Sequence, residues 1–132
     1  MIEGHCRCGA LRWTLSEPPA FANSCNCTSC RTSGALWAYG FEGQHIRVSG
    51  DTIGYSPDGG LTQHCCATCG GLGYWRGNGL NDEGRQPMAV NLRLAAPADI
   101  ADIPLRRFDG RDSWSTLPDD GRTVRDLWTM RP

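Results

Sequence analysis

Apolar and polar residues alternate along many short segments of this chain, and glycine, proline and Asn/Asp clusters separate the segments. In residues 11–15 and 88–94, apolar side chains recur at alternate positions. Such alternation is typical of β-strands with one buried and one solvated face. The pattern predicts strands over residues 2–8, 10–15, 35–41, 45–49, 61–65, 72–76 and 88–94. We therefore expect a mainly β protein built from antiparallel sheet.

Helical signals are few. Residues 27–32 can form one short helical turn, and residues 97–102 predict a brief helix before Pro104. Residues 106–132 carry scattered apolar side chains among turn residues, and we expect this tail to wrap over the sheet. Because the chain has no internal repeat and no long linker, residues 1–132 are expected to form a single domain.

The composition limits both the core and the partners. Seventeen glycines and eight prolines imply many turns and a modest core, which a metal that joins distant segments would stabilise. The formal net charge is −1 when every thiol is counted as neutral. One Zn(Cys)4 site and one Zn(Cys)3 site would bring the charge to about −4. This charge argues against a nucleic-acid partner.

The sequence shows no targeting or membrane segment. Residues 1–5 contain no basic segment followed by an apolar run, so we expect no signal peptide. No apolar stretch reaches the length needed to span a bilayer, so no membrane partner is expected. The expected location is cytoplasmic, where clustered cysteines stay reduced and serve as metal ligands or catalysts.

Seven of the eight cysteines fall into three clusters with the spacing of metal ligands. Cys6 and Cys8 can present both sulfurs to one metal if their segment is a strand, because residues i and i+2 share a face. Cys66 and Cys69, followed by two glycines, have the spacing of a zinc knuckle. Four thiolates close a tetrahedral site, so these four residues predict a structural zinc.

The middle cluster consists of Cys25, Cys27 and Cys30, which can all bind one metal. The spacing leaves two interpretations open: the site is closed by a fourth ligand, or the fourth position is open to a substrate. Candidates for a fourth ligand are Cys65, His64 and His5. An all-sulfur ligand set lowers the Lewis acidity of zinc, so an open site would favour holding a substrate thiol as thiolate.

Other candidate residues have ordinary structural explanations as well. Cys65 would point away from Cys66 on a strand, so we expect a packed thiol. Arg31 follows the middle cluster and Arg76 ends a predicted strand. Either arginine is a candidate to bind a substrate carboxylate, although a surface ion pair is the commoner role. The five tryptophans are too scattered for a nucleotide-stacking stripe and are expected in the core or in pocket walls.

The three cysteine motifs, taken in order, resemble one known family. The motifs are residues 4–13, 24–31 and 66–70, and the similarity continues into residues 106–110 and 117–122. They resemble the glutathione-dependent formaldehyde-activating enzyme family, which also includes centromere protein V.

This resemblance implies a β-tent fold, in which folded antiparallel sheets surround a structural zinc. It implies one structural zinc and one catalytic zinc. The structural ligands would be Cys6, Cys8, Cys66 and Cys69, and the catalytic ones Cys25, Cys27 and Cys30. The implied activity is that of a carbon–sulfur lyase, which forms or cleaves a thiol–aldehyde adduct. The default pair is glutathione and formaldehyde, which gives S-(hydroxymethyl)glutathione.

One departure from the family pattern is Asn26, at a position where the family often has histidine. Asparagine cannot shuttle a proton near neutral pH as imidazole does. Two other classes of function remain alternatives. One is a non-catalytic zinc module that binds protein or nucleic acid. The other is a metal buffer or redox sensor that uses Cys65 as a resolving thiol.

Overall fold

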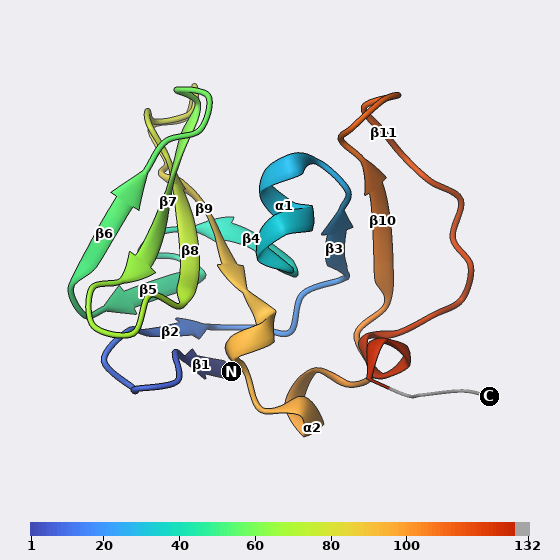
Figure 1. Cartoon of the computed structure of the whole chain (residues 1–132), viewed down its shortest axis with the longest axis horizontal. Helices are drawn as coiled ribbons and strands as arrows, with labels where there is room; N and C mark the ends of the chain where they lie inside the picture. The colour runs from blue at the N-terminus through green and yellow to red at the C-terminus, as the bar shows by residue number, and fades with distance from the viewer. Residues whose placement is uncertain (129–132) are drawn as a thin grey trace.

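The computed structural model describes residues 1–128, and its strands form a smaller and a larger sheet (Figure 1). The strands are β1 (Ile2–His5), β2 (Arg12–Leu15), β3 (Ala22–Cys25), β4 (Trp37–Phe41), β5 (Ile46–Ser49), β6 (Thr52–Tyr55), β7 (Leu61–Cys66), β8 (Leu72–Gly77), β9 (Pro87–Asn91), β10 (Leu105–Asp109) and β11 (Ser115–Thr116). The smaller sheet has the order β1-β2-β5, and the larger has the order β11-β10-β3-β4-β9-β8-β7-β6. The prediction of a mainly β fold is confirmed.

The helices of the described chain are short. They are α1 (Thr28–Ser33), α2 (Pro97–Ile100) and the 3-10 helices η1 (Leu92–Leu94) and η2 (Val124–Leu127). Both α-helices fall where the sequence predicts them, although each differs by one or two residues at its ends. None of the described helices has the length and apolar character needed to cross a bilayer.

Two predicted strands end earlier than expected. The strand predicted over residues 2–8 ends at His5, so Cys6 and Cys8 lie in a turn and not on a strand. The strand predicted over residues 88–94 ends at Asn91, whose side chain accepts hydrogen bonds from the backbone N–H groups of Leu36 and Arg93. The hydrogen bond from Arg93 caps η1, and the chain turns into a helical conformation there.

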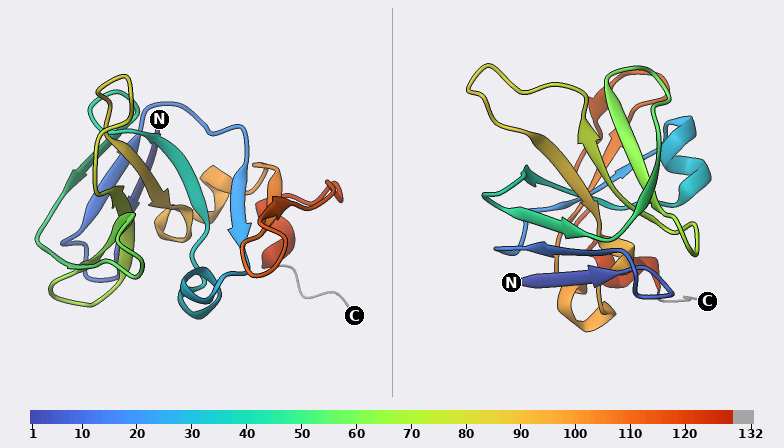
Figure 2. Two further views of the ribbon diagram at one scale, coloured as in Figure 1. Left: turned by 90° about the horizontal axis from the view of Figure 1, so that it is seen from above. Right: turned by 90° about the vertical axis from the view of Figure 1, so that its left-hand side faces the viewer.

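The C-terminal segment joins the larger sheet and does not wrap over it. β10 pairs with β3 in parallel, so the larger sheet is mixed and not purely antiparallel. β11 then pairs antiparallel with β10 and forms the edge of the sheet. The parallel pair is possible because the long connection between the two strands crosses the whole molecule (Figure 2). The last four residues of the predicted tail lie outside the described residues.

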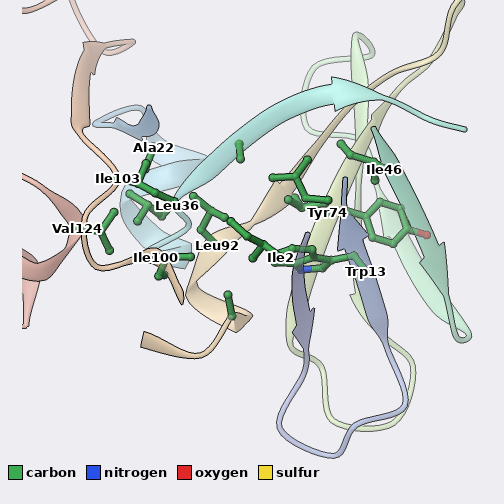
Figure 3. Close-up of a cluster of buried hydrophobic side chains, with 14 of the residues drawn as sticks. Ile2, Trp13, Ala22, Leu36, Ile46, Tyr74, Leu92, Ile100, Ile103 and Val124 are labelled. Carbon is green, nitrogen blue, oxygen red and sulfur yellow. The ribbon is translucent and has the colours of Figure 1, made fainter. Parts of the chain in front are cut away.

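The hydrophobic core connects both sheets with the C-terminal segment (Figure 3). Trp13 and Ile46 come from the smaller sheet, Tyr74 and Val90 from the larger sheet, and Val124 from η2, and all five are buried. A small separate cluster contains Ala35, Trp37 and Ala89, and Cys30 packs against it. The core therefore fixes the sheets relative to each other, and the separate cluster supports one of the cysteine groups.

Candidate functional site

Two chain turns bring four cysteines together at one end of the molecule. The turn between β1 and β2 carries Cys6 and Cys8; Cys66 is the last residue of β7, and Cys69 lies in the turn that joins β7 to β8 (Figure 1). Their four Sγ atoms lie within 4.8 Å of one another. The two turns thus unite residues that are about half the chain length apart, as the sequence predicts.

The two turns are built alike, although their cysteine spacings differ. In the first, the N–H of Gly9 donates to the carbonyl of Cys6 at 3.0 Å, and Gly9 has a φ of 83°. In the second, the N–H of Gly70 donates to the carbonyl of Cys66 at 2.9 Å, and Gly70 has a φ of 80°. Glycine adopts this left-handed conformation without a steric penalty. Cys6 and Cys8 therefore converge through a knuckle and not through strand alternation.

The geometry of this group fits a tetrahedral ion. The Sγ of Cys8 lies 3.6 Å from the Sγ atoms of both Cys6 and Cys66. Sulfurs bound tetrahedrally at Zn–S distances near 2.3 Å are about 3.8 Å apart. Backbone N–H groups of Cys8 and Gly71 lower the pKa of Cys69 to about 6, which favours the thiolate.

The middle cysteines lie where β3 passes into α1. Cys25 is the last residue of β3, Cys27 caps the helix, and Cys30 lies in its first turn. The Sγ of Cys25 accepts from the N–H of Cys27 at 3.4 Å, and the Sγ of Cys27 accepts from the N–H of Cys30 at 3.5 Å. The three Sγ atoms lie within 4.8 Å of one another, and no other metal-binding side chain of the described residues belongs to this group. This arrangement supports the open interpretation.

The pKa values of the thiols in this cluster indicate that a bound cation would stabilise their ionised forms. Burial raises the pKa of Cys30 to about 12, and the neighbouring Cys27 and Cys25 contribute to the shift. Burial acts against ionisation at Cys27 too, but the N–H of Cys30 and further hydrogen bonds outweigh it and lower the pKa of Cys27. Three thiolates this close repel one another unless a positive ion lies among them. The donor set therefore fits zinc, for which thiolate is a preferred ligand.

All three middle cysteines line a cavity of about 330 Å³. Its lining residues come from β3, β4 and β10, from β7, β8 and the loop before β7, and from α1. Aromatic side chains dominate its wall: Trp37, Tyr39, Trp75, Phe108 and Trp114. This size and mainly apolar lining are typical of a small-molecule site.

Trp114 is held against the cavity by an unusual backbone conformation. Its φ is 54°, which makes it the one non-glycine residue with a positive φ in the described part of the chain. Its N–H donates to the carbonyl of Asp109 at 2.7 Å, and its ring packs edge-on against Phe108 at 5.3 Å. Backbone strain of this kind is concentrated at functional sites.

The arginines predicted to bind substrate do not line this cavity. Arg31 is exposed near the end of α1, and Arg76 forms a 2.6 Å ion pair with Glu42. Whether either binds a substrate stays a prediction. The arginine of the cavity wall is Arg106, on β10. The sequence analysis missed it because β10 was not predicted: Leu105 and Phe108, the apolar residues of this segment, are three positions apart and do not show strand alternation.

The other candidate ligands lie apart from the metal clusters. Cys65 is partly buried and does not belong to the group of Cys66, as expected for a packed thiol. His64 stacks on Tyr74 at 4.7 Å between ring centroids, and its Nδ1 lies 2.8 Å from the hydroxyl of Thr52. The Nδ1 of His5 lies 2.8 Å from the carbonyl oxygen of Cys6. None of the three completes the middle cluster.

A chain of hydrogen bonds runs along one wall of the cavity and was missed from the sequence. The Nε of Arg106 donates to the Oδ1 of Asn23 at 3.1 Å, and the Nδ2 of Asn23 donates to the hydroxyl oxygen of Tyr39 at 2.6 Å. Asn23 is buried, with 3% of its surface exposed. Because arginine can only donate, this chain orients the Asn23 amide and leaves the Tyr39 proton to point elsewhere.

Asn26 has a structural role at the edge of the site. Its Nδ2 donates to the Oδ1 of Asp109 at 3.0 Å, and its Oδ1 accepts from the N–H of Arg111 at 2.9 Å. Asn26 does not line the cavity. It therefore connects the middle cluster to the loop after β10, which carries Trp114.

Comparisons with known proteins place the chain in a family. A family model described as glutathione-dependent formaldehyde-activating enzyme matches residues 1–99. A crystal structure of a Rhodobacter sphaeroides protein, a structural genomics target, is similar with a TM-score of 0.58 and 25% sequence identity. The match covers 78% of this chain and 98% of that chain. No curated protein matches significantly. The family match includes all seven clustered cysteines, and the chain belongs to the glutathione-dependent formaldehyde-activating enzyme family.

Proposed function

We propose that the protein is a zinc-dependent enzyme of the carbon–sulfur lyase type, which forms or cleaves the adduct of a thiol and an aldehyde. Glutathione and formaldehyde are the first pair to test, because the family model carries their names. One observation carries the proposal: the three-cysteine cluster lines an aromatic cavity of substrate size, whereas the four-cysteine cluster is not part of the cavity lining. The reaction needs reduced cysteines, so we place the protein in the cytosol.

In this proposal the two clusters have different roles. Cys6, Cys8, Cys66 and Cys69 hold a structural zinc that joins two distant turns and stabilises the fold. Cys25, Cys27 and Cys30 hold the second ion with three ligands, as in catalytic sites. Zinc in such a site keeps a substrate thiol ionised at neutral pH.

Residues of the cavity wall would complete the reaction. The aromatic side chains hold thiol and aldehyde close together, which provides much of the acceleration in a bimolecular addition. When the thiolate sulfur bonds to the carbonyl carbon, the C=O π bond breaks and the oxygen needs a proton. Tyr39 donates it, because its hydroxyl oxygen already accepts from Asn23 and its own proton is directed elsewhere. The phenolate then regains from solvent the proton that the thiol lost.

Metal content and turnover should be measured on the same preparations. We compare the wild type with Cys27→Ser and Cys69→Ser by elemental analysis under reducing conditions. Cys27→Ser should lower zinc from two to about one per chain and keep the fold, whereas Cys69→Ser should destabilise the fold.

Turnover is best followed by NMR exchange between free thiol and adduct, because the adduct also forms without an enzyme. The proposal predicts that catalytic amounts of wild type accelerate exchange and that Cys27→Ser does not. If a fully zinc-loaded wild type accelerates exchange for no thiol–aldehyde pair, the proposal is wrong. A non-catalytic zinc module would then be the better explanation.

A further inference from the structure

Arg106 lies in the cavity wall with its guanidinium fixed and partly unused. The guanidinium carbon stacks 3.8 Å from the centroid of the Phe21 ring, and Nε donates to Asn23. The structure gives no partner to the two terminal nitrogens of this side chain within residues 1–128. A planar donor group is therefore held in place and presents unused N–H groups in a substrate-sized cavity.

Arg107, the next residue of β10, is neutralised by contacts within the protein. Arg107 lies 3.3 Å from the carboxylate of Asp120, and one of its terminal nitrogens donates to the carbonyl of Pro118 at 2.9 Å. Arg107 does not line the cavity, since successive residues of a strand point to opposite faces. Arg106 and Arg107 are thus successive residues of β10, of which Arg107 has an ion pair and Arg106 has none among the described residues.

The register of the parallel pair places Arg106 beside the middle cluster. Arg106 pairs with Asn23, and two residues further on Phe108 pairs with Cys25. Two residues of parallel strand span about 6.6 Å. A small molecule whose one end contacts Arg106 is therefore long enough for its other end to reach the cysteines of the middle cluster.

Asp58 is the acidic side chain of the cavity lining, and it does not neutralise Arg106. Its Oδ1 accepts from the N–H of Gly60 within the turn between β6 and β7. No ion pair joins it to Arg106 among the described residues. The positive charge of Arg106 thus remains for a ligand.

From this placement we infer that Arg106 binds a carboxylate of the substrate, so that the cavity selects a small thiol or aldehyde that carries a carboxylate. The inference deepens the proposed function and rests on it for the reacting group. A carboxylate matches the two terminal N–H groups of a guanidinium, and a charge-assisted pair of this kind is among the stronger hydrogen bonds in proteins. The aromatic wall then contacts the apolar part of the molecule.

Binding of two thiols of equal length tests the inference. Isothermal titration calorimetry on the zinc-loaded protein compares 3-mercaptopropionate with 3-mercaptopropan-1-ol. Wild type should bind the carboxylate thiol about tenfold or more tightly. Arg106→Gln should remove this preference, and the matched control Arg107→Gln should keep it. Arg106→Lys, which keeps the charge without the planar fork, should retain part of it and provides a second variant if the glutamine protein folds poorly.

The ratio of the binding constants of the two thiols distinguishes recognition of the carboxylate from other effects of the substitution. Arg106→Gln also disturbs Asn23 and Tyr39, but that disturbance acts on both thiols alike and cancels in the ratio. An unchanged ratio in Arg106→Gln would overturn the inference and assign any carboxylate preference to the metal. The exchange assay is independent: loss of preference without any accelerated exchange would support the carboxylate site and contradict the proposed enzyme activity.

Discussion

The indole Nε1 of Trp37 donates a hydrogen bond to the Sγ of Cys30 at 3.4 Å. The same indole is buried in the small cluster with Ala35 and Ala89, so its position is fixed by packing. Since Cys30 is one of the three middle cysteines and Trp37 also lines the cavity, one side chain belongs to both the proposed metal site and the substrate wall.

Trp37→Phe should weaken metal binding at the middle site. The ring remains, but the donor to the Cys30 sulfur is lost, and a hydrogen bond to a charged group contributes enough to weaken zinc affinity by about tenfold. Chelator competition measures the affinity of each zinc. Trp75→Phe is the matched control, because Trp75 lines the same cavity and makes no hydrogen bond to a cysteine sulfur in the described chain. Equal zinc release from both variants would contradict this role of Trp37.

Gly110→Ala should disturb the middle cysteine cluster by steric clash alone. A Cβ at Gly110 would lie 2.6 Å from the Sγ of Cys25 and 3.2 Å from the Cβ of Cys27, and both cannot be accommodated without a shift. Overpacking of this kind typically costs about 1–3 kcal/mol, so zinc affinity of this site should fall by about tenfold or more. After challenge with a chelator, elemental analysis should show loss of one zinc while the four-cysteine site stays filled.

Gly79→Ala is the control for this prediction, since a Cβ there meets no atom within 4 Å and no left-handed conformation is required. It should keep both zincs. Full retention of zinc by Gly110→Ala under chelator challenge would mean that Cys25 is not a ligand in the position described.

Tyr39 should titrate above the range of an ordinary tyrosine. Loss of water contact raises the pKa of its phenol, and Arg106 and Asn23 only partly oppose this shift. A pKa raised by folding means that the protonated phenol stabilises the fold below the unfolded value near 10, and that this contribution is lost as pH rises through the folded pKa. The proton donor is therefore available throughout the neutral range.

Absorbance at 295 nm measures this titration directly. The difference between wild type and Tyr39→Phe should show one phenol that ionises above pH 10. In the exchange assay, Tyr39→Phe should lower kcat by about a hundredfold or more, the usual contribution of a general acid. A titration below pH 10, or unchanged kcat in Tyr39→Phe, would remove Tyr39 from the reaction.

Asn26→His should change exchange activity by less than about threefold. Asn26 does not line the cavity, and its contacts are Asp109 and the backbone of Arg111. Histidine can still donate to the Asp109 carboxylate, so the loop that carries Trp114 should remain attached. A large gain in kcat would instead show that a histidine at this position takes part in proton transfer. Asn26→Ala provides the comparison, since it loses both contacts and should expose the loop to proteolysis.

The sequence predicts the cysteine groups well because ligand spacing is a local property. The pairs Cys6/Cys8 and Cys66/Cys69 meet as expected. The expected mechanism for the first pair was wrong: strand alternation was assumed, but the backbone at Gly9 turns left-handed and forms a knuckle. A glycine directly after a Cys-x-Cys motif is the signal that distinguishes the two cases.

The cavity wall was harder to predict, because it depends on pairing between distant segments. β3 and β10 are short, and their parallel register is set by the packing of the whole chain. No local sequence pattern predicts that Arg106 lies beside Asn23, or that Tyr39 is the next residue in that chain of hydrogen bonds. The arginines predicted from proximity in sequence, Arg31 and Arg76, accordingly do not line the cavity.

The parallel pairing of β10 with β3 has a consequence for how such a protein can diversify. The family match ends at residue 99, and both cysteine groups precede that point. Arg106, Phe108 and Trp114, which form one wall of the cavity, all follow it. If the proposed function holds, the metal ligands and one wall of the substrate cavity are thus encoded in separate stretches of the gene. Exchange of the stretch after residue 99 between relatives would alter one wall of the cavity, and would leave the reacting centre intact only where a glycine is kept at position 110 beside Cys25.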